Sequence, residues 1–185
     1  MNNNIQSILT DIKRHLIRAF AQLDGWFDKE EEALYSVPLQ GSRRMADILG
    51  NTMHINRLLL EEVHTRSIRA VDLAANSDFP LALAAYEFNK SSLDETAVAN
   101  LIEEIRAEAR QLQSLQHVRR ELRDQLNECL YHLELLGNGE GALYRAVMAF
   151  NSLLELDAYQ CLYFVALNAD HSASRLRQAW EGVSH

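Results

Sequence analysis

The most informative segment of the chain reads Asp157-Ala-Tyr-Gln-Cys-Leu-Tyr-Phe-Val-Ala-Leu167. Its run of apolar residues predicts a helix that is buried almost all round, the position of a helix surrounded by others. Asp157 followed three residues later by Gln160 predicts an N-cap at the start of this helix, and Gly182 follows its expected end. We therefore searched the rest of the chain for helices that could surround it.

Three further segments carry an apolar stripe with the i, i+3, i+4, i+7 spacing of an amphipathic helix. The first covers 5–27, the second begins after Gly41-Ser42 and decays after Thr65, and the third covers 92–136 with a break expected near 113–117. Ser92 and Glu95 predict a capping box at the start of the third segment, and Gly137 predicts its end.

The connections between these helices are less regular. We predict a loop over 28–41 and a long connection with a short helix or two over 66–90. A turn at 138–141 precedes residues 142–156, which fit either a short helix or extended chain. Seven Gly and two Pro in 185 residues are too few turn residues for a β-sandwich or barrel. The sequence thus predicts an all-α fold, a four-helix bundle with one long crossover, in a single domain over 1–185.

Composition excludes several classes of function. Eighteen Lys and Arg against 26 Asp and Glu give a net charge of −8, so we expect no nucleic-acid partner. The longest uninterrupted apolar run, 161–167, is far shorter than the ~20 residues of a membrane span, and the N-terminus lacks the features of a signal peptide. We expect a cytoplasmic protein in which Cys129 and Cys161 are buried free thiols, a catalytic thiol being the alternative.

Two parts of the sequence resemble the DinB-like superfamily of bacterial helical bundles, which also holds thiol-dependent transferases. The resemblance rests on Ala46–Thr52 followed by Ile55–Leu59, and on Asn138–Gly141, Leu143-Tyr144, Met148, Asn151 and Asp157–Phe164. It covers 41–63 and 118–180 and leaves 66–117 out. It implies an up-down-down-up bundle with a long crossover that is often a homodimer.

The resemblance also implies a site with three histidines that converge on zinc, nickel or iron. Carried over without gaps, those positions are Asn51, Asn168 and Ser172, so the three imidazoles are replaced by neutral oxygen donors. His54 and His171 each lie one helical turn from one of these positions. We predict that the five residues line one polar pocket at one end of the bundle and that the pocket holds no stoichiometric metal.

Two functions remain open. In the first, the chain is a DinB-like protein with a degenerate metal site that binds a small polar or thiol ligand as a homodimer. Apolar residues near the helix ends, Leu34, Tyr35 and Trp180, add to the expectation of a dimer. In the second, it is a transferase or hydrolase, either metal-dependent with a displaced site formed by His54 and His171 or metal-free through the hydrogen bonds of the pocket itself. Whether the chain is an enzyme stays open.

Overall fold

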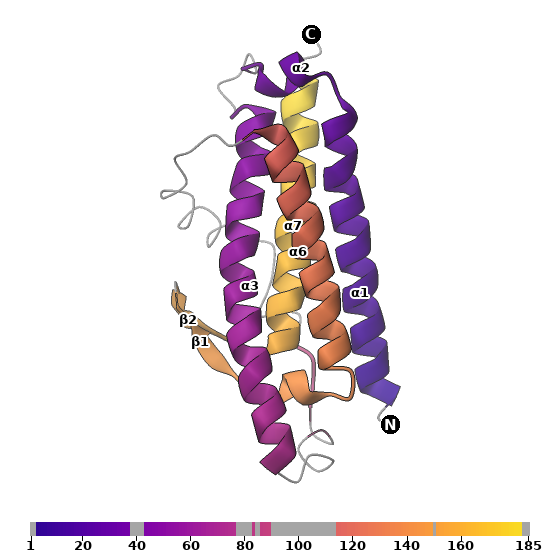
Figure 1. Ribbon diagram of the computed structural model, residues 1–185, viewed down its shortest axis with the longest axis vertical. Coiled ribbons are helices and arrows are strands. Elements are labelled where there is room, and N and C mark those ends of the chain that lie inside the picture. Colours follow the sequence, from indigo (N-terminus) through magenta and orange to yellow (C-terminus); the bar gives the residue numbers. More distant parts are fainter. Residues whose placement is uncertain are drawn as a thin grey trace.

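The computed structural model of the chain describes residues 3–37, 43–76, 83, 86–89, 114–149 and 151–182. Within these ranges, four long helices make up most of the structure (Figure 1). They are α1 (Asn3–Asp24), α3 (Met45–Asn76), α6 (Leu115–Leu135) and α7 (Ala158–Glu181). The all-α class predicted from the sequence is therefore confirmed.

The four long helices lie side by side, with α7 packed between α1 and α3. In Figure 1, α1 and α7 run from the lower to the upper end of the molecule, whereas α3 and α6 run downward. Helix α6 packs against α3 and α1 and completes the bundle. The first and last helices are thus parallel neighbours, although they lie at opposite ends of the sequence.

The long connections contain more structure than the sequence suggests. The predicted loop over 28–41 is wrong in part: the 3-10 helix η1 (Gly25–Asp28) is followed by a short helix, α2 (Glu31–Tyr35). Helix α2 forms because Leu34 is buried in the core beside α3. The predicted N-cap at Gly41-Ser42 lies outside the described residues.

The predicted end of the second helix is also wrong, since α3 continues beyond Thr65 to Asn76. Arg66, Ser67 and Ala70 are buried on the face that continues the helix's apolar stripe. Because arginine is a polar residue, Arg66 interrupts the apolar pattern, and hydrophobicity alone does not predict that the buried face continues. Most of the long crossover to α6 lies outside the described residues, as does the capping box predicted at Ser92.

The break expected near 113–117 coincides with the start of α6, where the Ser114 hydroxyl accepts a hydrogen bond from the His117 N–H. Helix α7 begins as predicted: Asp157 and Gln160 form a reciprocal capping box. Between Tyr159 and Leu167, every side chain except Tyr163 and Leu167 itself is buried. None of the helices in the described part of the chain is long and apolar enough to span a membrane.

Residues 142–156 form mainly extended chain. After a 3-10 turn, η3 (Glu140–Ala142), strands β1 (Ala146–Met148) and β2 (Asn151–Leu156) pair antiparallel, with Ala146 opposite Leu156 and an irregularity after Val147. This hairpin lies against the lower half of α3 in Figure 1. The extended alternative for this segment is therefore the correct one.

A buried guanidinium holds the hairpin on α3. The Arg66 side chain is only 1% exposed. Its Nε donates to the Leu156 carbonyl at 2.9 Å and its Nη2 to the carbonyls of Ala146 and Val147, while Nη1 pairs with the Glu62 carboxylate and backbone carbonyl. Glu62 in turn accepts the Ala149 N–H. These bonds account for all five guanidinium N–H groups.

We expect Arg66→Ala to lower the free energy of unfolding by about 3–5 kcal/mol, because it removes the cation paired with the Glu62 carboxylate and leaves several carbonyls without their donor. Arg69→Ala, which removes an exposed arginine from the next turn of α3, is the matched control and should change stability by less than about 0.5 kcal/mol. Urea unfolding measures both. Equal effects of the two variants would contradict the role assigned to Arg66.

The turn at 138–141 depends on two glycines. Gly139 has φ = 111°, a left-handed conformation that favours glycine. A Cβ on Gly141 would lie 2.7 Å from two ring carbons of Tyr159. That ring cannot move away easily, because it is fully buried and its hydroxyl donates to the Leu136 carbonyl.

Gly141→Ala should therefore destabilise the protein by about 1–3 kcal/mol through overpacking. Gly50→Ala is the control: nothing lies within 4 Å of the new methyl group, and the higher helix propensity of alanine should stabilise α3 by up to about 1 kcal/mol. Thermal unfolding of the two variants should show shifts of opposite sign. A rise in melting temperature for Gly141→Ala would refute the close packing against Tyr159.

Candidate functional site

The residues predicted to form the pocket lie on α3 and α7, two helices that pack directly against each other. Asn51, Asn168 and Ser172 are buried, and His54 and His171 are partly exposed. The predicted set is thus divided between the interior of the bundle and its surface.

The central contact of the site is a hydrogen bond between two buried amides. Asn168 Nδ2 on α7 donates to Asn56 Oδ1 on α3 at 2.8 Å, and both residues are 0% exposed. Asn56 does not belong to the predicted set. The partner of Asn168 is therefore an amide one turn beyond Asn51 along α3.

A third helix contributes to the same region. Gln125 on α6 is buried, and its Nε2 donates to the Met53 carbonyl at 2.8 Å, between Asn51 and Asn56 in the sequence of α3. We call Asn51, Asn56, Gln125 and Asn168 the amide layer. Asn51 and Asn56 belong to α3, and Gln125 and Asn168 donate hydrogen bonds to residues of the same two turns of that helix.

The amide layer keeps hydrogen-bonding capacity that the described residues do not use. Among those residues, no partner exists for the donors Asn51 Nδ2 and Asn56 Nδ2, or for the acceptors Gln125 Oε1 and Asn168 Oδ1. Buried polar atoms in proteins are nearly always paired, with protein, water or ligand. An uncharged group that offers both donors and acceptors can bind a small neutral polar molecule, but it supplies neither a nucleophile nor a general base.

The residues at the three carried-over positions do not fit the divalent metal that the resemblance implies. Asn51, Asn168 and Ser172 offer only neutral amide and hydroxyl oxygens. Such donors hold zinc, nickel or iron weakly without imidazole or thiolate. Within the described ranges, no three His, Cys, Asp or Glu side chains converge as a metal site would require.

Buried ionisable groups elsewhere are used for structure. Asp157 accepts the Gln160 N–H at 2.8 Å and the Tyr86 hydroxyl at 2.9 Å, and its burial raises the carboxyl pKa. Cys129 and Cys161 are buried free thiols, as the sequence predicts. Burial raises the pKa of Cys161 to about 12, and it also raises that of Cys129. A buried thiol that stays protonated is a poor nucleophile.

One buried histidine is coupled to a neighbour. His132 on α6 is 2% exposed, and its ring lies edge-on to that of His64 on α3, with centroids 5.9 Å apart. Burial, and secondly the His64 imidazole, lower the pKa of His132 below its usual 6.5. The unfolded chain therefore takes up a proton at this residue at a higher pH than the folded chain.

It follows that the free energy of unfolding should fall as the pH is lowered from about 7 to about 5, because the unfolded state then binds more protons. His132→Gln should make this fall smaller. Urea unfolding at a series of pH values measures the slopes. Identical slopes for the wild-type protein and His132→Gln would contradict the assignment.

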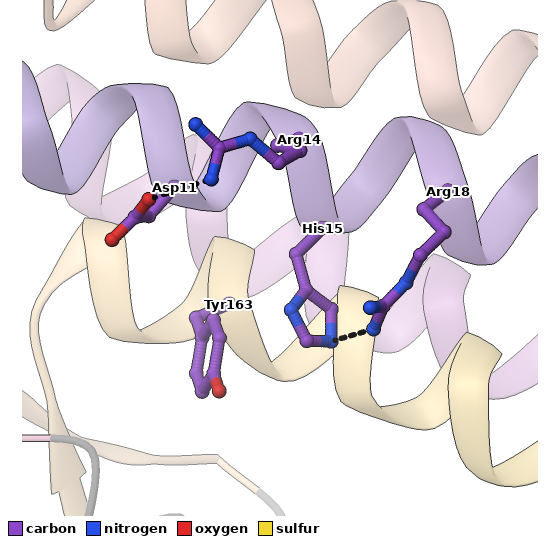
Figure 2. Close-up of a pocket in the computed structure, with 5 residues that line it drawn as sticks. All are labelled: Asp11, Arg14, His15, Arg18 and Tyr163. Carbon is purple, nitrogen blue, oxygen red and sulfur yellow. Dashed lines mark hydrogen bonds and ion pairs between the residues drawn. The ribbon is translucent and has the colours of Figure 1, made fainter.

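A second polar site lies on the surface between α1 and α7. A cleft of about 270 Å³ is lined by Asp11, Arg14, His15, Arg18 and Tyr163, which we call the α1–α7 cleft. Figure 2 shows Arg14 and Arg18 on opposite sides of His15, with the Tyr163 ring below. His15 Nε2 lies 2.6 Å from Asp170 Oδ2, and the other ring nitrogen faces the side where Asp11 and Tyr163 lie.

Comparison with known proteins adds no relative: no protein-family model, no curated protein and no solved structure matches the chain. Its sites are therefore interpreted from its own residues.

Sequence reasoning missed Asn56 and Gln125 in the interior and His15 and Asp170 on the surface. Gln125 had a usable signal, because it occupies a core position between Leu122 and Cys129 on the apolar stripe of α6. Asn56 likewise falls beside Ile55 and Leu59 on the buried face of α3. His15 and Asp170 had none, since 155 residues separate the two partners.

Proposed function

We propose that this chain is a DinB-like bundle that binds a small, uncharged polar or thiol-bearing molecule at the amide layer without the three-histidine metal site of that superfamily. The observation that carries the proposal is the set of buried amide donors and acceptors without partners among the described residues. Three of the four residues come from α3 and α7, the two helices on which the resemblance implies the site, and Gln125 comes from α6.

The arrangement of the helices supports the resemblance. The first and last long helices of the chain, α1 and α7, run in one direction, and the two between them, α3 and α6, run in the other (Figure 1). This is the up-down-down-up order that a DinB-like bundle would have. The turn at 138–141 and the capped start of α7, both part of the resemblance, have structural roles in this chain.

The chemistry of the layer limits the ligand. Its free atoms are two amide N–H donors and two amide carbonyl acceptors, so a molecule that both donates and accepts hydrogen bonds is complementary to it. The amide layer itself contains no charged side chain, and an ion would lose its hydration there without a counter-charge. A hydroxyl, an amide or a protonated thiol meets these conditions.

We expect acetamide or 2-mercaptoethanol to raise the melting temperature of the wild-type protein, since a ligand at about 100 times its Kd stabilises by about 2.7 kcal/mol. Asn168→Leu should abolish the rise, because it removes the Oδ1 acceptor and the bond to Asn56. Asn127→Leu, which changes an exposed asparagine of α6, should keep it. A differential scan with each compound gives the comparison.

If the compounds stabilise neither protein, or stabilise Asn168→Leu as much as Asn127→Leu, the amide layer is not a ligand site. A double variant Asn56→Leu/Asn168→Leu that responds to either compound as the wild type does would likewise place the binding elsewhere in the protein.

A displaced metal site is the second candidate, and one atom favours it. His54 Nε2 is buried and has no partner among the described residues. With His171 it would provide the two imidazoles needed for affinity. Elemental analysis after re-addition of zinc or nickel tests this: one metal per chain, lost in both His54→Ala and His171→Ala, would move the chain to the metal-dependent enzymes.

The homodimer remains part of the proposal. Leu34 does not contribute to it, because it is buried, and Trp180 packs on Trp26 within the chain. Exposed apolar side chains lie instead near the ends of α3 and α6, among them Ile68, Tyr131 and Leu135. Light scattering should give twice the 21.1 kDa of one chain, and Ile68→Glu should shift the mass to that of the monomer. A monomeric mass for the wild type would refute the dimer.

A further inference from the structure

We propose that the α1–α7 cleft binds a small molecule through an oxyanion group, a carboxylate or a phosphate, held between Arg14 and Arg18 with the rest of the molecule over Tyr163. This site is independent of the amide layer, because its side chains are on the surface of the bundle and come from α1 and the outer side of α7.

Asp170 positions two of the donors in advance. Its Oδ2 accepts from His15 Nε2 at 2.6 Å and from Arg18 Nη2 at 2.9 Å, and the side chains of both His15 and Asp170 are about three-quarters buried. Charge-assisted hydrogen bonds of this length fix the orientation of the groups that make them. A ligand therefore meets His15 and Arg18 already ordered, which reduces the entropy lost on binding.

Both arginines keep donors for a ligand. Arg18 donates from Nη2 to Asp170, and no described residue accepts from its Nε or Nη1. Arg14 makes one ion pair, 3.4 Å long, with Asp11, and the two side chains are 73% and 48% exposed. So exposed a pair contributes little to stability, and Arg14 can turn to an incoming anion. A guanidinium matches the geometry of a carboxylate or phosphate.

The charges of the cleft limit how tightly it binds. Asp11 and Asp170 balance the two arginines, so an anion is selected by the placement of the N–H groups and not by a positive field. We therefore expect binding in the micromolar to millimolar range, from hydrogen bonds at a partly hydrated site.

Tyr163 provides an aromatic surface for the body of the ligand. Its ring is edge-on to His15 at 5.3 Å between centroids and to Phe88 at 5.7 Å. Burial, and secondly Asp170, raise the pKa of the phenol, so its hydroxyl remains a neutral group at physiological pH. A cleft of about 270 Å³ is below the usual size of a drug-sized pocket and suits a single ring with one anionic group.

The test is a calorimetric titration of the full chain with benzoate, phenyl phosphate and, as a neutral analogue of benzoate, benzamide. We expect one or both oxyanions to bind at one site per chain and benzamide to bind at least about tenfold more weakly. Binding of benzoate alone or of phenyl phosphate alone would identify the ligand as a carboxylate or a phosphate.

Arg14→Gln and Arg18→Gln should each weaken binding of the oxyanion by about tenfold. Arg57→Gln removes the same charge from an exposed position of α3 and should change the affinity less than twofold. The Arg14 guanidinium bonds to the exposed Asp11 and is itself largely exposed, so Arg14→Gln keeps the comparison valid even if Arg18→Gln loses stability. Asn168→Leu should leave this binding intact, which separates the result from that for the amide layer.

No binding of either oxyanion at millimolar concentration would overturn the proposal. Equal losses of affinity in Arg14→Gln and Arg57→Gln would also overturn it, because they would indicate a general effect of charge. Equal affinity for benzoate and benzamide would overturn it as well.

Discussion

The Arg66 guanidinium lies where α3, the hairpin and the start of α7 meet, and each of its N–H groups has an acceptor there. Three of those acceptors are backbone carbonyls of β1 and β2, so one side chain of α3 is bonded to both strands of the hairpin. The hairpin is too small to be stable by itself. Its position on the bundle thus depends on a charge that is buried and completely paired.

The interior of the bundle shows the opposite condition. The residues Asn51, Asn56, Gln125 and Asn168 are buried like Arg66, yet part of their hydrogen-bonding capacity is unused by the described residues. A core that only had to be stable would place leucine at these positions, because unpaired buried polar atoms are unfavourable. Because of this contrast between one satisfied polar group and four incompletely satisfied ones, we give Arg66 a structural role and propose ligand binding only for the amide layer.

A structural element could be predicted from the sequence where the residues that determine it are close together in the chain. The capping box of Asp157 and Gln160 and the apolar run behind it lie within a few residues of one another, so the start of α7 could be predicted. The last turns of α3 could not, because Arg66 acquires its acceptors from residues 80 to 90 positions further along the chain. The same reason hid the pairing of Asn168 with Asn56 and of Asp170 with His15. A polar residue that is usually exposed becomes part of the core or of a site because of a distant partner, and the periodicity of the sequence does not reveal that partner.

The packing of α1 has a consequence for synthesis of the protein. Its long neighbours are α6 and α7, both in the second half of the sequence, so the apolar stripe that includes Ile5, Ile12 and Leu16 has neither helix to cover it while the chain is being made. Contacts between residues so far apart in the sequence form late, and they lower the rate of folding. A ribosome-bound chain that has reached only α3 therefore presents an amphipathic helix without its final partners, and this apolar surface stays open to aggregation until α7 has left the exit tunnel.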